Sequence, residues 1–359
     1  MIRLLREWVQ RYFSDPQAAV LALFLVLGAA IMFMMGQILA PVLAAVIIAY
    51  ILEGFVGSLD RLRIPRIIAV LFVFLTFIVS LLILLFGLLP LLSGQLAHLI
   101  GDLPAMITYI QSELVRLPEK YPDIISEDQA SAILRMLAAE MASIGQQILS
   151  FSLASVRSAI TFLIYLIIVP LLVFFFLKDK DEILLWLQEF VPEKHDLSEQ
   201  VWHEVDRQMG RYIRGKFLEI LIVWCGSYLT FYILGLDFAM LNGFIMGLSV
   251  LIPYVGAMAA FLPVMLTSYF QWGSSPETLY VIVAYWAIQL LDGNLLAMLL
   301  LSDVVNLHPV AVIISVVVFG GLWGFWGLFF AIPLATLFQA VLRAWPRAPV
   351  QDQKREVPS

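Results

Sequence analysis

Residues 238–270 read FAMLNGFIMGLSVLIPYVGAMAAFLPVMLTSYF, an apolar stretch of 33 residues without a charged side chain. As one straight α-helix it would be about 50 Å long, whereas the hydrocarbon core of a bilayer is about 30 Å thick. The run Ile252-Pro253-Tyr254-Val255-Gly256 interrupts it near the middle, where proline removes a backbone donor and glycine loosens the helix. Such breaks persist at membrane depth only where they are buried or line a wet cavity. A kinked, tilted helix would satisfy the pattern, but we favour a hairpin that enters the membrane and returns, with residues 254–256 near its tip.

A second broken stretch covers residues 309–342 and has 34 residues. Small and bulky side chains alternate in its middle and a proline follows, as in the first stretch; the residues concerned are Gly320, Gly321, Trp323, Gly324, Trp326, Gly327 and Pro333. Repeated breaks in corresponding places are the best pointer in a sequence to a transporter's binding region. We predict a second hairpin with a gate at its tip, residues 321–324, where the indoles close the pathway and the glycines let the tip swing. The alternative is close helix packing, in which the glycines only make room for the tryptophans.

The composition of the whole chain is that of a membrane protein. Of its 359 residues 62% are hydrophobic and 13% are charged, whereas a soluble domain has roughly 25% charged residues. The predicted fold is an all-α polytopic membrane protein with about eight membrane segments. Besides the two broken stretches, apolar runs of spanning length cover residues 18–35, 38–56, 67–92, 159–177, 217–234 and 279–301. The single cysteine, Cys225, excludes an intrachain disulfide and is expected to pack within an apolar run.

The distribution of basic residues predicts the orientation. If both termini are cytoplasmic, 17 of the 21 Lys and Arg residues lie on the cytoplasmic side. The predicted segments are a cytoplasmic amphipathic N-terminus (1–17), spans one to three (18–92), an extracytoplasmic amphipathic helical segment (93–158), a fourth span (159–177), a cytoplasmic helical loop (178–216), a transport core (217–342) and a cytoplasmic tail (343–359).

Acidic residues in the predicted transport core are candidates for function. Residues 217–342 contain no Lys or Arg in 126 positions, yet they contain five acids. A carboxylate within a bilayer is costly and usually functional. Asp292 lies near the middle of a span and shares a helix face with Gln289, and with Asp303 if the helix continues. The pattern fits a site for a cation, a proton or a polar substrate group. The alternative is a buried Asp that is either protonated or satisfied by Asn and Gln on neighbouring helices.

Other polar residues extend this predicted pathway. Along the fifth span Glu219, Gly226, Thr230 and Asp237 follow one line, which is either a helix-packing seam or a pathway wall. Glu219 has a simpler alternative role, as the partner of Arg214 or Lys216. Between the seventh span and the last stretch, Asn306 is predicted to cap a helix that begins at Pro309, and His308 is a second polar residue at this helix entrance. The predicted pathway residues are therefore Asp292, Gln289, Asn294, Glu219, Asp237, Asp303, Asn306 and His308.

Signatures of several other protein classes are missing from the sequence. There is no His-Glu-x-x-His, no Gly-x-Ser-x-Gly, no paired Cys or His at metal spacing, and no Walker phosphate loop. We therefore expect no enzymatic activity, no metal, no cofactor and no nucleic-acid partner. The prediction is a secondary transporter that is not driven by ATP. The alternative from a different class is a non-transporting scaffold, in which the segment 178–216 binds a partner and the acids only pack.

Several motifs together carry a family resemblance over nearly the whole chain. They are Phe174-Phe175-Phe176-Leu177-Lys178-Asp179-Lys180-Asp181, Tyr212-Ile213-Arg214-Gly215-Lys216, Leu251-Ile252-Pro253-Tyr254-Val255-Gly256, Asp292-Gly293-Asn294, Val305-Asn306-Leu307-His308-Pro309 and Gly320-Gly321-Leu322-Trp323-Gly324 through Ala331-Ile332-Pro333-Leu334. With these motifs the chain resembles the autoinducer-2 exporter family, most closely its permease branch in Gram-negative bacteria. The resemblance implies about eight membrane segments, the bacterial inner membrane and self-assembly as a pentamer. It also implies export or exchange of small molecules, with sodium–proton antiport in some members. Two positions depart from the family pattern: Met298 stands where a proline is common, and Trp224 where glycine is common.

Overall fold

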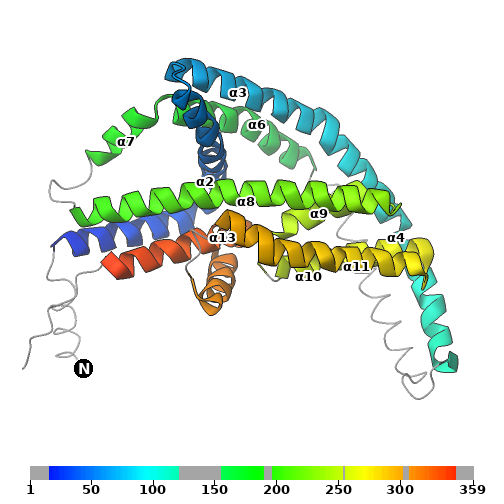
Figure 1. Cartoon of the computed structure of the whole chain (residues 1–359). Helices are drawn as coiled ribbons and strands as arrows, with labels where there is room; N and C mark the ends of the chain where they lie inside the picture. The colour runs from blue at the N-terminus through cyan, green and yellow to red at the C-terminus, as the bar shows by residue number, and fades with distance from the viewer. Residues whose placement is uncertain (1–15, 121–154, 190–195, 254, 302–306, 345–359) are drawn as a thin grey trace, which may run out of the picture.

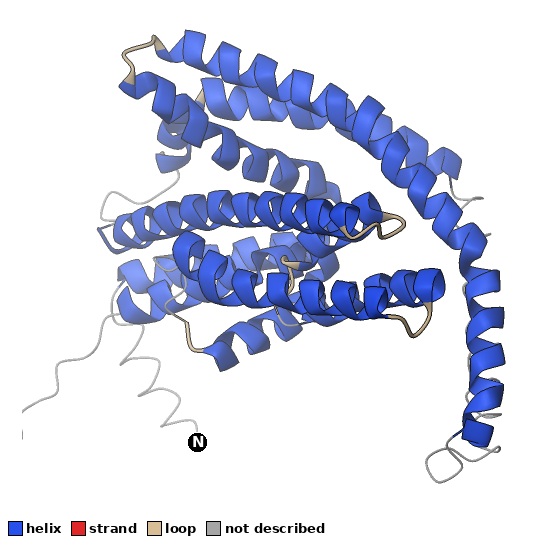
Figure 2. Ribbon diagram, turned by 45° about the vertical axis from the view of Figure 1, so that its right-hand side comes forward, coloured by secondary structure: helices blue, strands red, loops and turns tan. Residues whose placement is uncertain are grey.

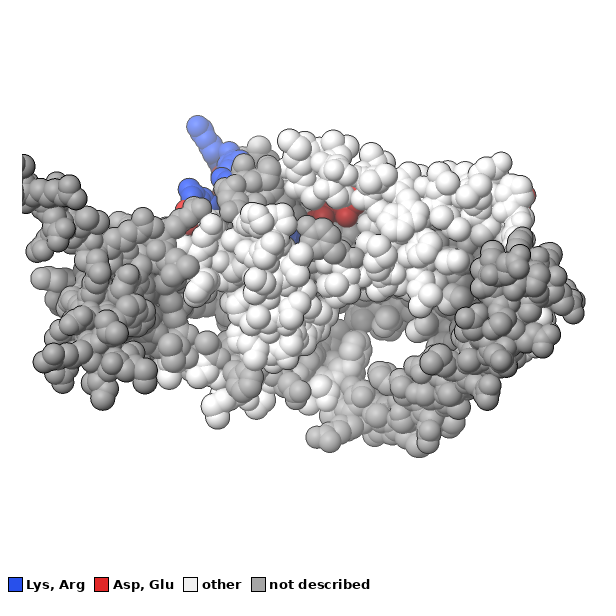
Figure 3. Space-filling model, turned by 90° about the horizontal axis from the view of Figure 1, so that it is seen from below, with Lys and Arg blue, Asp and Glu red and all other residues white. Residues whose placement is uncertain are grey.

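The computed structural model describes residues 16–120, 155–189, 196–253, 255–301 and 307–344, and these ranges contain helices and turns but no strand (Figure 2). Seven helical segments within them are long and apolar enough to cross a membrane, and one further apolar helix is shorter. The prediction of an all-α polytopic membrane protein is confirmed. In the space-filling view of Figure 3 most of the visible described surface is uncharged, with basic side chains near one end and one acidic patch near the middle. A surface of this kind suits contact with lipid.

The first two predicted spans form a single helix. Helix α2 (Pro16–Arg61) has 46 residues and contains Pro41, so its length is about 69 Å. The residues between the two predicted spans include no cluster of turn-forming residues, and an isolated glycine such as Gly36 does not end a helix. The described side chains of its second half pack against α6 (Ser155–Lys178), which contains the fourth predicted span.

The third predicted span continues without a turn into the segment that follows it. Helix α3 (Arg66–Ile83), the π-helical turn η1 (Leu84–Leu88) and α4 (Leu89–Lys120) form one long curved rod that arches over the other helices (Figure 1). The rod reaches about 80 Å, which exceeds the thickness of a bilayer core. Of the predicted amphipathic segment 93–158, residues 93–120 belong to α4, the last four begin α6, and residues 121–154 lie outside the described ranges.

Helix α8 (Asp196–Ile233) is the central element of the fold. It unites most of the predicted loop 178–216 with the fifth predicted span in one helix of 38 residues. The loop begins with a short helix of its own, α7 (Lys180–Gln188). Helices α2, α9, α11, α12 and α13 all pack against α8. Side chains on its different faces therefore reach most of the predicted transport core.

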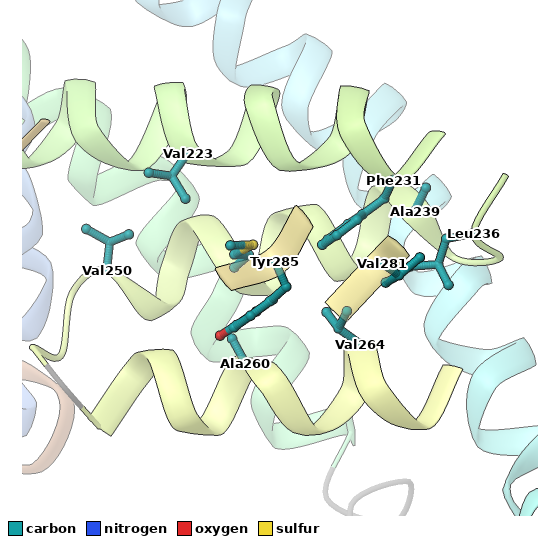
Figure 4. Packing of buried hydrophobic residues seen from close by; sticks show 10 residues of the cluster. Val223, Phe231, Leu236, Ala239, Val250, Ala260, Val264, Val281 and Tyr285 are labelled. Atoms are coloured by element: carbon teal, nitrogen blue, oxygen red, sulfur yellow. The ribbon is translucent and has the colours of Figure 1, made fainter. Parts of the chain in front are cut away.

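The first broken stretch folds into a helical hairpin rather than one kinked helix. Helices α9 (Ala239–Ser249) and α10 (Val255–Trp272) are antiparallel, because Asn242 near the start of α9 meets Thr267 near the end of α10, whereas Gly256 lies against the carbonyl of Ser249 at the turn. A side chain larger than hydrogen at Gly256 would collide with that carbonyl. Figure 4 shows the apolar core that the hairpin forms with α8 and with α11 (Pro276–Leu291), which contributes Tyr285 and Val281.

Two glycines allow α9 to lie directly on α8. A Cβ on Gly243 would lie 2.8 Å from the backbone nitrogen of Tyr228, and one on Gly247 would lie 2.7 Å from Cβ of Trp224. The spacing Gly243-x-x-x-Gly247 brings both glycines onto one face of the helix, where their missing side chains let two backbones approach. Trp224, which departs from the family pattern, thus packs over a glycine of the neighbouring helix.

The second broken stretch also turns back on itself. Helix α13 (Pro309–Ala344) contains a non-helical residue, Gly324, with φ 57° and ψ −131°. After this turn Gly327 lies directly against the carbonyl oxygen of Phe319, and a Cβ on Gly320 would lie 2.5 Å from Leu328 Cδ2. The predicted tip, residues 321–324, thus contains the turn. Gly324 supplies a backbone conformation that other residues rarely adopt, and Gly320 and Gly327 supply room for the two arms.

A buried charged cluster between α8 and the π-helical turn

An ion pair lies inside the bundle on α8. The ammonium Nζ of Lys216 is 3.0 Å from Oε2 of Glu219, and the two side chains are only 5% and 3% exposed. Because the residues are three positions apart, they share one face of the helix. Of the partners considered for Glu219 from the sequence, the structure selects Lys216. Residues 217–342 contain no Lys or Arg, but Lys216 lies beside one of their acids in the structure. The predicted transport core therefore does have a basic side chain nearby.

Asp292 faces this pair from another helix. It ends α11 and opens the π-helical turn η2 (Asp292–Leu296), which α12 (Ala297–Leu301) follows. The residue is 8% exposed, and its carboxyl group interacts with Glu219 and with Lys216. One of its oxygens, Oδ1, is buried without a hydrogen-bond partner among the described residues. A π-helical turn widens the helix and shifts the side-chain register, and such turns are frequent at functional sites.

The charges in this cluster do not balance when all three groups are ionised. Two carboxylates then face one ammonium, which leaves a net charge of about −1 in a poorly solvated place. Close carboxylates in such surroundings avoid double ionisation by binding a proton, or they are neutralised by a cation. The unpaired Oδ1 of Asp292 offers lone pairs that can bind a proton or coordinate a cation. Among the described residues, no group of three or more His, Cys, Asp or Glu side chains forms a metal site.

Gln289 connects the neighbourhood of Asp292 to the α9–α10 hairpin. Its amide nitrogen donates to the hydroxyl of Tyr285 over 3.2 Å, and that hydroxyl donates to the backbone carbonyl of Ala257 in α10. Asn294 behaves differently, since its side-chain amide donates to the carbonyl of Leu290 on its own helix and the residue is exposed. The structure thus places Gln289 beside Tyr285 but leaves Asn294 facing outward.

The remaining predicted pathway residues lie away from the cluster or outside the described ranges. Asp237 is exposed in the turn between α8 and α9, and its backbone N–H donates to Gln271. Asp303 and Asn306 fall in residues 302–306, which the structure does not describe. His308 caps α13: its carbonyl accepts from Ala311 and Val312, and its Nδ1 accepts from the N–H of Val310 over 3.3 Å.

The line of residues along the fifth span is not one continuous feature. Glu219 is buried, whereas Gly226 is exposed with open space around it. The hydroxyl of Thr230 donates back to the carbonyl of Gly226. Thr230 also lines an apolar pocket of about 430 Å³ between α8 and α11, together with Ile233, Leu234, Tyr280, Val283 and Ala284. Within one protomer this line therefore does not form a helix-packing seam.

The predicted gate residues occupy the two turns. Pro253 lies in the first turn and its carbonyl accepts from Val255, while Tyr254 is not described. In α13 the indole of Trp323 stacks on Phe319 and that of Trp326 on Phe330, each along its own arm. Pro333 is buried in the second arm. The carbonyl one turn before it, that of Phe329, accepts from the hydroxyl of Tyr212 in α8.

Sequence reasoning missed several polar contacts of α8. Tyr212, Lys216 and Glu219 recur at helical spacing, a pattern that would have placed them on one face. A second polar group joins α8 to α2: the hydroxyl of Tyr50 donates to Asp206 over 2.5 Å. The side chain of Arg214 lies beside them, in a slot left open by Gly54 and Gly210. No sequence pattern distinguished these glycines from others.

Ion pairs also fix the end of α2 that adjoins α3. Glu53 on α2 pairs with Lys180 at the start of α7, 3.0 Å away, and with Arg66 at the start of α3, 3.5 Å away. Arg66 donates in addition to the carbonyl of Leu177 at the end of α6. Four helices thus meet at one carboxylate.

Comparisons with known proteins agree with this architecture. The chain matches the family described as "AI-2E family transporter" over residues 21–347. It is 40% identical over 353 residues to the "Putative permease PerM" of Escherichia coli K12, covering 98% of this chain and 100% of the relative. It is 27% identical over 306 residues to the "Putative transport protein YueF" of Bacillus subtilis, covering 84% and 82%. It is 24% identical over 310 residues to the "AI-2 transport protein TqsA" of Escherichia coli K12, covering 86% of each chain.

The names of these relatives describe a permease and transport proteins, and the family match extends over the hairpins and the buried cluster. The chain, a multi-pass helical membrane protein, therefore belongs to the AI-2E family of transporters.

Proposed function

We propose that the protein is a secondary transporter of the bacterial inner membrane that exports a small polar molecule or ion, and that the cluster of Lys216, Glu219 and Asp292 is its coupling site. The observation that carries the proposal is the unsatisfied, buried oxygen of Asp292 beside a second carboxylate and one ammonium. Such a group gains a proton or a sodium ion readily and loses it again when the surroundings change. A secondary transporter works by binding and releasing such an ion in alternation.

The two hairpins support a transport pathway. Each places an interruption of the helix at a turn held by glycine, and interrupted helices at membrane depth need a protein or water environment. We propose that both hairpins are re-entrant and meet the pathway at their turns, with Gly324 at the moving tip of the second. Gln289 and Tyr285 would carry polar contacts from Asp292 towards the first hairpin.

The orientation and assembly are part of the proposal. Basic residues gather at the ends of helices that would face the cytoplasm, which favours cytoplasmic termini. Many apolar side chains of α3, α6 and α11 are exposed on the single protomer, so they face lipid or other protomers. We expect a homo-oligomer, a pentamer by family resemblance.

A reconstituted transport assay tests this function. Purified protein in liposomes loaded with a pH-sensitive dye receives either an inward sodium gradient or none, and proton movement is recorded. Autoinducer-2 is the first solute to test, because the name of one relative gives AI-2 as its cargo. Ion-dependent flux that empty liposomes lack supports the proposal. Absence of flux for protons, sodium and solute, with correctly inserted protein, favours the scaffold instead.

A further inference from the structure

The second arm of α13 contains a backbone carbonyl that has lost its regular i+4 partner within the helix. In an α-helix the carbonyl of Phe329 would accept from the N–H of residue 333, but residue 333 is a proline and has no N–H. The carbonyl is partly buried, because Phe329 itself is half-buried and the four residues that follow it are all buried. A buried carbonyl without a partner is costly, so a donor from elsewhere is expected.

That donor comes from α8. The hydroxyl of Tyr212 points at the Phe329 carbonyl from 3.4 Å, the long end of hydrogen-bonding distance, and Tyr212 is only 1% exposed. Its ring belongs to a core cluster with Val312 of the first arm and Ile332 of the second. Tyr212 therefore shares one core with both arms of the hairpin, and its hydroxyl bonds to the backbone carbonyl that Pro333 has freed on the second.

Tyr212 is also next to the charged cluster. Tyr212, Lys216 and Glu219 occupy positions i, i+4 and i+7 of α8, which places them on one face over about two turns. The Glu219 carboxylate is near enough to interact electrostatically with the phenol. A shift of α8 or a change of charge at Glu219 therefore alters the hydrogen bond between the Tyr212 hydroxyl and α13.

We propose that Tyr212 and Pro333 form a tether: Pro333 frees the carbonyl of Phe329, and the hydroxyl of Tyr212 binds it, tying the second hairpin to the face of α8 that carries Lys216 and Glu219. Tyr212 is then a positioning residue that transmits changes at the cluster to the hairpin. Only the second part of this proposal, that the tether transmits changes at the cluster to the hairpin, rests on the proposed function. Its existence is tested without any transport measurement.

The test uses a rescue. Tyr212→Phe removes only the hydroxyl and leaves the Phe329 carbonyl unpaired, so the Tm in detergent should fall. Pro333→Ala restores a backbone N–H at the position that can bond this carbonyl, so the double variant should regain most of the lost Tm. Tyr285→Phe is the matched control: it also removes a buried hydroxyl that donates to a carbonyl, that of Ala257, and Pro333→Ala should not rescue it.

A second readout separates tethering from simple stability. In a Cys225→Ser background, Leu322→Cys places a thiol at an exposed position near the turn of α13. Maleimide labelling of Cys at that position should be faster in Tyr212→Phe and should stay faster in the double variant, because its carbonyl is satisfied but α13 is no longer tied to α8. Tyr285→Phe should leave the labelling rate unchanged.

Two results would overturn the tether. One is an unchanged Tm and labelling rate in Tyr212→Phe. The other is a double variant whose Tm loss equals the sum of the two single losses. If instead the tether holds but Asp292→Asn transports normally, the coupling site is wrong and the tether stands.

Discussion

Lys216 and Glu219 bind each other within α8, with 3.0 Å between ammonium and carboxylate and almost no access to solvent. Hydropathy draws the start of the fifth span just after Lys216, yet the helix passes this point without interruption. A buried charge persists in such a place only with a partner. The pair is therefore the reason that the last basic residue before the transport core lies inside the bundle.

Asp292→Asn should abolish ion-coupled flux in proteoliposomes while leaving expression and oligomer size unchanged. The amide keeps the shape of the side chain but can neither take up a proton nor neutralise a cation. Asp237→Asn is the matched control, because the same chemical change is made at an exposed turn away from the cluster. Normal flux in Asp292→Asn would remove this residue from the mechanism.

Lys216→Met should destabilise the protein strongly. It leaves two carboxyl groups facing each other without a cation, and breaking a buried ion pair in this way costs about 3–5 kcal/mol. Glu219→Gln in the same chain removes one of the two acids, so the double variant should recover much of the loss. Thermal unfolding followed by size-exclusion chromatography measures both. A double variant that is less stable than Lys216→Met would contradict the charge argument.

Gly324→Ala should destabilise the second hairpin by about 1–3 kcal/mol, because φ 57° with ψ −131° is essentially restricted to glycine. This cost arises from the backbone, since a Cβ at this position would meet open space. Gly321→Ala is the control: it is three residues away, helical, and equally open. Limited proteolysis and Tm of the two variants compare them directly, and equal behaviour of both would show that the turn tolerates a side chain.

Labelling from each side of the membrane should fix the topology. In a Cys225→Ser background, Ser274→Cys lies in the exposed turn between α10 and α11, and His308→Cys lies just before α13. With cytoplasmic termini and a re-entrant first hairpin, an impermeant maleimide should reach the first thiol from outside the cell and the second only after permeabilisation. Both thiols reacting from the same side would refute this topology.

The hairpins were predictable because their causes are local. Pro253 cannot donate the backbone hydrogen bond of a continuing helix, and the chain turns between the end of α9 at Ser249 and the start of α10 at Val255. The glycines of the second stretch predict a turn, although only the backbone angles show that the turn is at Gly324. The fusion of predicted spans in α2 has a converse explanation. Hydropathy assigns spans of about the length that crosses a bilayer. A helix, however, ends only at a breaker or a cap, so it can continue from one assigned span into the next.

The buried cluster was only half predictable. Helical spacing placed Gln289 and Asp292 together, and Asn294, only two positions after Asp292, lies on the other side of the helix and is exposed. The sequence did not reveal the π-helical turn that begins at Asp292. The π-helical turn depends on the side chains that pack around it, and their arrangement cannot be derived from one sequence. Lys216 was assigned to a loop because charged residues usually mark the membrane boundary. Its burial follows from Glu219 and Asp292, one of which is more than seventy positions away in sequence.

The short length of α9 has a consequence for how the protein is made. Eleven residues extend about 17 Å, too little for the insertion machinery to treat the helix as a span. Its partner on α8, the surface of Trp224 and Tyr228, is synthesised immediately before it and is complete when Gly243 and Gly247 emerge. The hairpin is thus expected to enter the membrane by docking on α8 during synthesis. Bulky substitutions at either glycine should then appear first as degraded, unassembled chains, before any defect in activity is measurable.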